Sequence, residues 1–199
     1  MVEGLRERKK RATRRAISDA ATELFMKKGF DNTSVVEIAE VVGVSPQTVL
    51  NYFPAKTDLF FDENHWYAGP PRAVRDRRSR TSPTMAVREW YLADLRRRYG
   101  EGHLDGLEVY MQTIAGSDTL RRRRLDDVAA LTVALRAALD DTSPDGSAWE
   151  RQLSAAILTS AIMVAESETA RLSRILGGAD LLVAAQQAAT SIFKRTAHA

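Results

Sequence analysis

The chain of 199 residues contains no cysteine, which removes several kinds of chemistry at once. Disulfide bonds, thiolate metal ligands and a cysteine nucleophile are excluded. The three histidines, His65, His103 and His198, do not have the spacing of metal ligands. The sequence therefore predicts neither a metal site nor a cofactor.

Long apolar runs are also absent. The longest uncharged stretches, 152–165 and 181–193, are shorter than the roughly 18 apolar residues of a membrane-spanning helix. The first residues are charged and do not lead into the apolar segment of a secretory signal. We therefore expect a cytoplasmic protein with no membrane partner.

Enzyme motifs are missing as well. The sequence has no glycine-rich loop that would cradle a phosphate and no nucleophile motif. Acidic pairs such as Asp126-Asp127 are adjacent on a predicted helix and do not converge. We predict that the protein is not an enzyme. An all-α enzyme or adaptor that binds anions through the arginine clusters at 96–98 and 121–124 is the last-ranked alternative.

Positive charge is concentrated in one segment. The formal net charge of the whole chain is only +3, yet residues 5–15 hold seven Lys or Arg and one Glu. The remainder of the chain is therefore net acidic. Such a basic segment suits nucleic acid as a partner, although a run of charge often does no more than face solvent.

Apolar residues recur with the helical period along most of the chain, as at Ile17, Ala21 and Leu24. No alternating pattern of β-branched residues indicates a sheet. The sequence predicts an all-α fold of about nine helices, near 8–28, 35–42, 46–53, 55–67, 83–99, 104–115, 118–140, 147–176 and 179–195.

Two domains follow from this pattern. Residues 1–55 should form a small three-helix domain and residues 56–199 a larger helical domain. The helix that joins them is expected to end where Gly69-Pro70-Pro71 interrupts the pattern. The basic residues 72–82 lack an apolar stripe, so they should form a loop or a frayed helix end.

Two short helices in the small domain have recognisable ends. Ser34 and Glu37 form a capping box, in which each side chain satisfies a free backbone N–H of the other residue. Gly43 should end this helix. Ser45 can cap the next helix, with Pro46 at its first position, where a missing N–H does no harm. This succession predicts a helix-turn-helix.

The second of these helices offers an outward polar face. With Val49 turned inward, the step of about 100° per residue points Gln47 and Asn51 away from the core. Amide side chains can pair with the edge of adenine, and the flanking Leu50 offers an apolar contact for a thymine methyl group. Phosphate partners should surround this face. They are Ser34, Thr48, Tyr52, Lys56 and the basic cluster that includes Lys10, Arg11 and Arg14.

The run GFDNTSVVEIAEVVGVSPQTVLNYFPAKTDLF at 29–60 resembles the N-terminal signature of the TetR family of bacterial transcriptional regulators. The glycine-aromatic pair, the capped EIA helix, the Gly-Val-Ser turn and the aromatic-Phe-x-x-Lys exit occur in the family's order. Beyond about residue 60, the chain agrees with the family only in the number and length of helices. The resemblance implies phosphate contacts for Ser34, Ser45, Thr48, Tyr52 and Lys56, and base contacts for Gln47 and Asn51.

Two positions depart from the family pattern. Leu50 stands where the family usually has an aromatic residue, which removes one expected phosphate contact and alters the expected base preference. Ala55 stands where a Ser or Asn often caps the fourth helix. A plainer interpretation of 34–53 is two amphipathic helices of a bundle with a solvated polar face. The basic cluster and the matched signature favour DNA binding over it.

The last two predicted helices carry more apolar surface than one chain needs. Apolar side chains recur there at helical spacing; they include Leu153, Ile157, Leu181, Ala185, Ala188 and Ile192. In the TetR family the last two helices form a four-helix bundle across a two-fold axis, and this pair resembles them. We therefore expect a homodimer, with packing inside one chain as the alternative.

The resemblance also implies a small-molecule effector site in the larger domain. Aromatic, sulfur-containing and acidic residues are candidates for its lining; they are Trp66, Trp90, Tyr91, His103, Tyr110, Met111, Trp149, Met163 and Glu166. For each of them the alternative is ordinary core packing. A buried Glu166 would favour a cationic effector, whereas a solvated one would indicate nothing.

Together these features predict a homodimeric TetR-like repressor that binds a palindromic operator in double-stranded DNA. Its two recognition helices would read half-sites about 34 Å apart, and an effector would release it. The fourth helix is the expected coupling element, through Phe53 and Lys56. The first alternative is a DNA-binding regulator without an effector, controlled by a partner protein or by its abundance.

Overall fold

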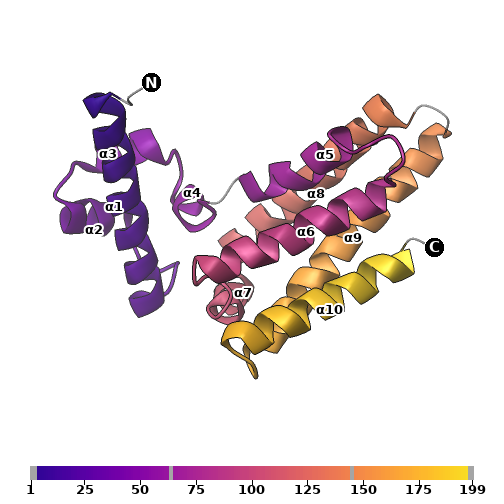
Figure 1. Ribbon diagram of the computed structural model, residues 1–199. Helices are drawn as coiled ribbons and strands as arrows, with labels where there is room; N and C mark the ends of the chain where they lie inside the picture. The colour runs from indigo at the N-terminus through magenta and orange to yellow at the C-terminus, as the bar shows by residue number, and fades with distance from the viewer. Residues whose placement is uncertain (1–3, 63–64, 144–145, 197–199) are drawn as a thin grey trace. The chain divides into compact units, whose positions relative to one another are not determined.

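The computed structural model describes residues 4–62, 65–143 and 146–196, without the side chains of His65 and Trp66. Within these residues the secondary structure is α-helical throughout (Figure 1), which confirms the predicted all-α fold. The helices are α1 (Leu5–Lys28), α2 (Val35–Val42), α3 (Pro46–Tyr52), α4 (Lys56–Phe60), α5 (His65–Arg75), α6 (Pro83–Gly100), α7 (Leu107–Gly116), α8 (Asp118–Thr142), α9 (Ala148–Ser173) and α10 (Gly178–Thr196). None of these described helices is long and apolar enough to cross a membrane.

The chain folds into two compact units. The N-terminal unit comprises Met1–Asn64 and Ala115–Arg123, and the C-terminal unit comprises His65–Ile114 and Arg124–Ala199. These limits differ from the predicted boundary between residues 55 and 56, because α4 belongs with α1, α2 and α3. They differ also because the chain returns to the N-terminal unit at Ala115–Arg123, from the end of α7 into α8, and no local pattern in the sequence marks this return.

A hydrophobic core joins α1, α2 and α3 in the N-terminal unit. Ile17 and Ala21 of α1, Ile38 of α2 and Val49 of α3 are all fully buried. Phe53, directly after α3, is buried with them. Because one face of α3 is used for this core, its opposite face is left to solvent.

The start of α8 completes the N-terminal unit. Leu120 is fully buried there. Ser117 Oγ donates to Asp31 Oδ1 at 2.9 Å, and Arg123 Nη1 donates to Asp58 Oδ1 of α4 at 2.8 Å. The single helix α8 thus contributes its residues up to Arg123 to the N-terminal unit and its later residues to the C-terminal unit.

The core of the C-terminal unit lies among α6, α9 and α10, and α10 runs beside both of the others (Figure 1). Leu95 of α6, Ile162 of α9, and Leu181 and Ala185 of α10 are fully buried. Leu135 of α8 packs into the same core.

Helix α5 corrects one prediction. Gly69-Pro70-Pro71 does not end a helix, because these residues lie inside α5. Both prolines are buried, and Gly69 packs so closely on α6 that a Cβ atom there would overlap the Trp90 ring. Burial against α6 offsets the backbone hydrogen bonds that the prolines cannot donate.

The count of helices changes for the same reason. The predicted helix at 55–67 is two helices, α4 and α5, so the described residues form ten helices where about nine were expected. Residues 72–75 are helical and belong to α5, whereas the prediction placed them in a loop or a frayed end.

Candidate nucleic-acid interface

The predicted capping box at the start of α2 is confirmed. Ser34 Oγ accepts from the backbone N–H of Glu37 at 3.1 Å, and Glu37 Oε2 accepts from that of Ser34 at 2.9 Å. Lys28 also donates to Glu37 Oε1. The hydrogen bond from Lys28, followed by those from Ser34, lowers the pKa of Glu37 to about 2. The carboxylate therefore stays charged at neutral pH and holds the start of α2.

The turn after α2 sets the direction of α3. Gly43 has φ 72° and ψ 35°, in the left-handed region that glycine enters without strain. Ser45 Oγ then accepts from the backbone N–H of Thr48 at 3.0 Å, and Pro46 stands in the first turn of α3. Both caps agree with the prediction, and α2, the turn and α3 form a helix-turn-helix.

The outward face of α3 is polar and exposed. Gln47 and Asn51 are exposed, and Leu50 beside them is 37% exposed. Gln47 Nε2 donates to Asn51 Oδ1 at 3.1 Å. Each amide keeps further hydrogen-bonding capacity, as pairing with the edge of a base requires. The Thr48 hydroxyl lies 2.8 Å from that of Ser45 at the N-terminal end of this face.

Lys56, a predicted phosphate contact, has partners inside the chain. Its Nζ donates to the carbonyl oxygens of Phe30 and Thr33, each at 2.9 Å, and lies 4.2 Å from the centre of the Phe30 ring. An ammonium group has three donors, so one more N–H is available for a phosphate. Lys56 thus holds the loop that leads to Ser34. Tyr52, another predicted contact, is half-buried at the end of α3.

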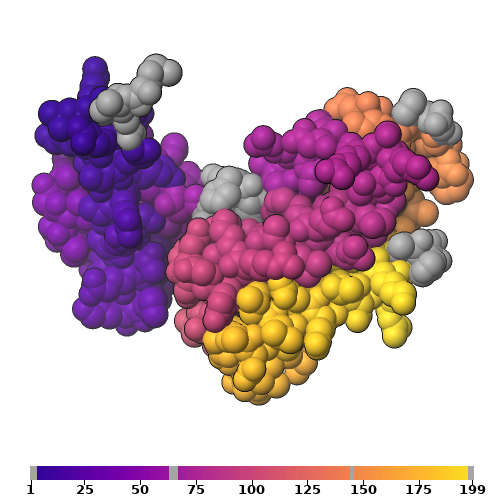
Figure 2. Space-filling model, in the orientation of Figure 1, coloured from indigo at the N-terminus to yellow at the C-terminus, as the bar shows by residue number. Residues whose placement is uncertain are grey.

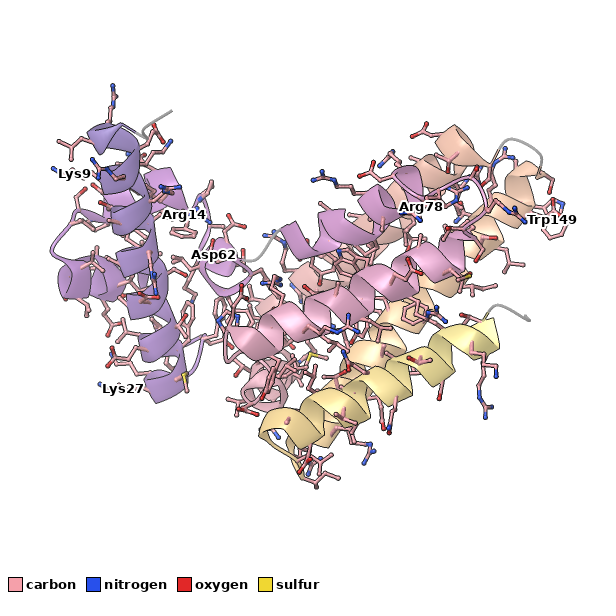
Figure 3. All side chains as sticks on the ribbon, viewed as in Figure 1. Lys9, Arg14, Lys27, Asp62, Arg78 and Trp149 are labelled. Carbon is pink, nitrogen blue, oxygen red and sulfur yellow. The ribbon has the colours of Figure 1, made fainter. Side chains whose placement is uncertain are left out.

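Arg14 is engaged in a similar way. Its guanidinium group pairs with Asp62, donates to the carbonyl oxygen of Tyr52 at 3.2 Å and lies 4.2 Å from the centre of the Phe53 ring. Ser18 Oγ donates to the other carboxylate oxygen of Asp62 at 2.9 Å. The side chains of Arg14 and Asp62 point toward each other (Figure 3). Sequence reasoning missed Asp62 and Ser18, although the i, i+4 spacing of Arg14 and Ser18 was an available signal.

The basic segment at the start of α1 is exposed. Lys10 and Arg11 are exposed, as is every described residue before them. Lys9 in the same segment is labelled in Figure 3, and Figure 2 shows the first turns of α1 at the surface of the N-terminal unit. This segment and the outward face of α3 are the groups that the N-terminal unit offers to an anionic partner.

Two of the predicted effector residues meet in the core of the C-terminal unit. The Tyr91 hydroxyl of α6 donates to Glu166 Oε1 of α9 at 2.8 Å, and both residues are buried. Arg98 Nη2 donates to the same oxygen at 2.7 Å and is buried as well. Asp94 and Thr169 complete this buried polar cluster. Burial raises the pKa of the Tyr91 hydroxyl well above its usual value, so Tyr91 remains a donor.

Arg98 changes the meaning of the buried Glu166. Because Arg98 neutralises the carboxylate, Glu166 no longer favours a cationic effector. Sequence reasoning placed Arg98 only in the arginine cluster at 96–98, although Tyr91, Leu95 and Arg98 stand at i, i+4 and i+7 and therefore share one helix face. Arg96, two residues earlier, is exposed, and the run of arginines at 96–98 therefore resembles a charged segment that faces solvent.

The other effector candidates are dispersed. Trp90 and Met163 pack partly buried against the same core, and Tyr110 and Met111 are half-buried on α7. His103 is exposed after α6, and Trp149 is 68% exposed at the start of α9 (Figure 3). These last two are surface residues and do not line the interior. The side chain of Trp66 lies outside the described residues.

The predicted dimer residues also divide. Leu181 and Ala185 are fully buried in the C-terminal unit, so they pack within one chain and cannot line a seam between chains. The remaining four are exposed or half-buried; they are Leu153, Ile157, Ala188 and Ile192. Val164 of α9 and Val183 of α10 are also exposed, at 54% and 52%. Because small residues occur in the inward apolar face of α10, its sequence has the same pattern as a helix that packs against a second chain.

A helix-turn-helix with exposed amides on its second helix and a basic segment nearby is the arrangement of a DNA-binding regulator. The family follows from comparison with known proteins. A family model described as "Bacterial regulatory proteins, tetR family" matches residues 17–62. The chain belongs to this TetR family of transcriptional regulators, which agrees with the prediction that it is not an enzyme.

Two curated relatives extend the similarity beyond the matched segment. The chain is 31% identical over 114 residues to the HTH-type transcriptional regulator TcmR of Streptomyces glaucescens. It is 30% identical over 152 residues to the HTH-type transcriptional regulator RutR of Escherichia coli K12. These matches cover 57% and 73% of this chain, but only 42% of TcmR and 66% of RutR.

The whole fold resembles solved structures of the same family. The structure described as an SmeT–triclosan complex has a TM-score of 0.63 and 16% sequence identity. The similarity covers 92% of this chain and 91% of that one. At this identity the likeness concerns the fold alone.

Proposed function

We propose that the protein is a homodimeric repressor that binds a palindromic operator through α3 and is released by a small-molecule effector. The observation that carries this proposal is the outward face of α3. Gln47, Leu50 and Asn51 are exposed on a helix whose start is held by the Ser45 cap. Amides read base edges, and a fixed helix start gives them a defined position in the major groove.

Dimerisation is proposed because one α3 is too short to specify an operator alone. The helix has only seven residues. Two copies about 34 Å apart would read two half-sites, and the two-fold symmetry of the dimer would appear as a palindrome in the DNA.

The surface proposed for the dimer is the exposed stripe of α9, in place of the buried stripe of α10. Leu153, Ala156, Ser160, Val164 and Ser167 are all exposed at helical spacing. Small residues in the middle of such a stripe permit close approach of a second helix. Half-buried Ala188 and Ile192 on α10 are further candidates.

Release by an effector is proposed for the C-terminal unit. The description of the SmeT structure names triclosan, a small molecule, as its ligand. In the present chain Tyr91 and Glu166 are predicted effector residues, and a ligand that bound at them would replace contacts of their buried cluster. Such a ligand weakens operator binding only as far as it binds the DNA-free protein more tightly than the DNA-bound protein.

The proposed coupling element is revised by the position of α8. The fourth helix was expected to transmit the signal through Phe53 and Lys56. The ion pair between Arg123 and Asp58 supports α8 as a second route, because this one helix belongs to both units.

The test of the proposal is selection of DNA by the purified full chain from a random-sequence pool, followed by footprinting at several salt concentrations. We expect a palindromic site protected on two adjacent major-groove faces and an affinity that falls steeply with salt. Binding without any preferred sequence would contradict the operator. A preferred site that is not a palindrome, bound by a monomer, would contradict the dimer.

A second candidate is a regulator without a small-molecule effector. The observation that favours it is the buried cluster of the C-terminal unit, in which Tyr91 and Arg98 both donate to Glu166. Thermal unfolding in the presence of a chemically diverse ligand set separates the two candidates. A ligand that raises the melting temperature and releases DNA supports the repressor, and an absence of both effects throughout the set supports the second candidate.

A further inference from the structure

The recognition helix α3 depends on groups outside itself for a fixed position. It has seven residues and no basic residue in its last turn. Isolated helices shorter than about 12 residues are marginal in water, and the last carbonyl groups of any helix lack partners within it. A cation placed at the C-terminal end of a helix is favourable because it meets these carbonyl groups.

Arg14 of α1 supplies the cation that α3 lacks. Its Nη1 donates to the carbonyl oxygen of Tyr52, the last residue of α3, at 3.2 Å. The same guanidinium group lies 4.2 Å from the centre of the ring of Phe53, whose backbone caps α3. One side chain thus contacts both the end of the recognition helix and the residue that anchors this end in the core.

Asp62 fixes the orientation of that guanidinium group. It pairs with Arg14 through one carboxylate oxygen and accepts from Ser18 through the other. The side chains of Arg14 and Asp62 are 43% and 26% exposed. A pair this exposed is screened by solvent and adds little to overall stability, so its effect is chiefly on geometry.

We infer that Ser18, Asp62 and Arg14 form a clamp that positions the end of α3, so that Arg14 is a positioning residue and not a phosphate contact. The inference rests on the proposed DNA-binding function. It assigns Asp62, an acidic residue in a unit that binds a polyanion, a favourable role in operator binding. A phosphate contact at Arg14 would give Asp62 the opposite role, because the carboxylate would then compete with DNA.

A clamp and a phosphate contact predict opposite effects of Asp62→Ala on operator affinity, so this substitution distinguishes them. Loss of a negative charge alone would tighten binding to every DNA. Loss of the clamp would weaken binding to the operator, because the base contacts of Gln47 and Asn51 need a fixed α3. We expect a loss of roughly fivefold, the size of a helix cap, on the selected site and none on a scrambled duplex.

The matched control is Asp19→Ala on α1. Asp19 pairs with Arg15 at 3.7 Å, and both side chains are largely exposed, with no contact to α3 described. This change removes the same charge and leaves the three side chains of the clamp in place. A second variant, Arg14→Lys, keeps the positive charge but loses the planar fork that serves the Tyr52 carbonyl and Asp62 together.

The experiment measures the affinity of the full chain for the selected site and for a scrambled duplex at several salt concentrations. We expect Asp62→Ala and Arg14→Lys to lose preference for the selected site by similar factors with an unchanged salt slope. Their double variant should be no worse than either one. Tighter binding of Asp62→Ala to both duplexes, or full retention of preference in Arg14→Lys, would overturn the clamp.

Hydrogen exchange without DNA separates this inference from the proposed function. Asp62→Ala should accelerate exchange of the amides of Asn51, Tyr52 and Phe53 several-fold and leave exchange in α2 unchanged. In the Asp19→Ala variant all of these amides should exchange as in the wild type. This result would uphold the clamp even if no operator were found. Unchanged exchange at the end of α3 would refute it, whatever the protein binds.

Discussion

The two units of this chain satisfy their polar side chains in different ways. In the N-terminal unit, Gln47 and Asn51 face solvent on α3. In the C-terminal unit, Tyr91, Arg98 and Glu166 are buried and bind one another. The first arrangement offers hydrogen bonds to an external partner as it stands. The second already satisfies polar groups within the chain, so a ligand that bound there would have to replace these internal contacts.

The largest expected effect comes from breaking the buried cluster. Arg98→Ala leaves Glu166 buried without its counter-charge, and we expect the C-terminal unit to lose about 3–5 kcal/mol of unfolding free energy. The three tryptophans at 66, 90 and 149 all belong to this unit, so tryptophan fluorescence during urea unfolding reports on it alone.

The control for this change is Arg96→Ala, an exposed arginine on the same helix. We expect its unfolding free energy, measured by the same fluorescence change, to stay within about 0.5 kcal/mol of the wild-type value. An Arg98→Ala variant that is equally undisturbed would show that the cluster does not hold the unit together.

The second effect concerns the exposed stripe on α9. Val164→Asp should weaken self-association by roughly 30-fold, because a carboxylate would be desolvated at the contact. Sedimentation equilibrium measures this change. Val109→Asp on α7, where the valine is equally exposed, is the control and should leave the association constant unchanged. A Val164→Asp protein that dimerises normally would move the interface elsewhere.

A smaller effect is expected at Lys56. Removal of its two hydrogen bonds to the carbonyl groups of Phe30 and Thr33 in Lys56→Ala should lower the stability of the N-terminal unit by about 1–2 kcal/mol. Far-UV circular dichroism should detect this loss while tryptophan fluorescence does not. Lys27→Ala, in which a more exposed ammonium group paired with Glu23 is removed, should change neither signal. An unfolding free energy of Lys56→Ala equal to that of Lys27→Ala would contradict the structural role of Lys56.

The smallest expected effect is the pH dependence of the stability of α2. The pKa of Glu37 is about 2 in the folded protein, below its ordinary value of 4.5, because of the hydrogen bond from Lys28 and those from Ser34. The unfolded chain therefore binds this proton more readily. The stabilisation is fully present above pH 4.5 and is lost as the pH falls toward 2.

Glu37→Gln removes this dependence. Hydrogen exchange in α2, corrected for the intrinsic rates, should become less sensitive to pH between 4.5 and 2 in Glu37→Gln, whereas Glu40→Gln on the same helix should resemble the wild type. Identical pH profiles for wild type and Glu37→Gln would contradict the role of the capping box.

The comparison of the two units also explains what the sequence could predict. Ser34, Gly43 and Ser45 act on backbone groups within four residues of themselves, so their roles are legible locally. Arg14 pairs with Asp62 and Arg98 with Glu166, far away in the sequence, and a cation with a distant partner has the same local pattern as a solvated one. For this reason the sequence did not indicate the contacts that Arg14 and Lys56 make within the chain, nor the buried position of Arg98; the phosphate contacts stay predictions.

Long-range packing accounts for the remaining differences. The burial of Leu181 and Ala185 and the helical state of Pro70-Pro71 both depend on neighbouring helices, which overrule the local pattern. The return of the chain to the N-terminal unit at Ala115–Arg123 likewise involves partners far away in the sequence, as in the hydrogen bond from Ser117 to Asp31.

The central claim is that the outward face of α3 reads DNA sequence, and the most direct measurement is the affinity of Gln47→Ala and Asn51→Ala for the selected site and for a scrambled duplex. We predict that each substitution lowers the preference for the selected site about tenfold or more, with an unchanged salt slope. A preference that survives both substitutions, or an equal loss on both duplexes, would contradict the account.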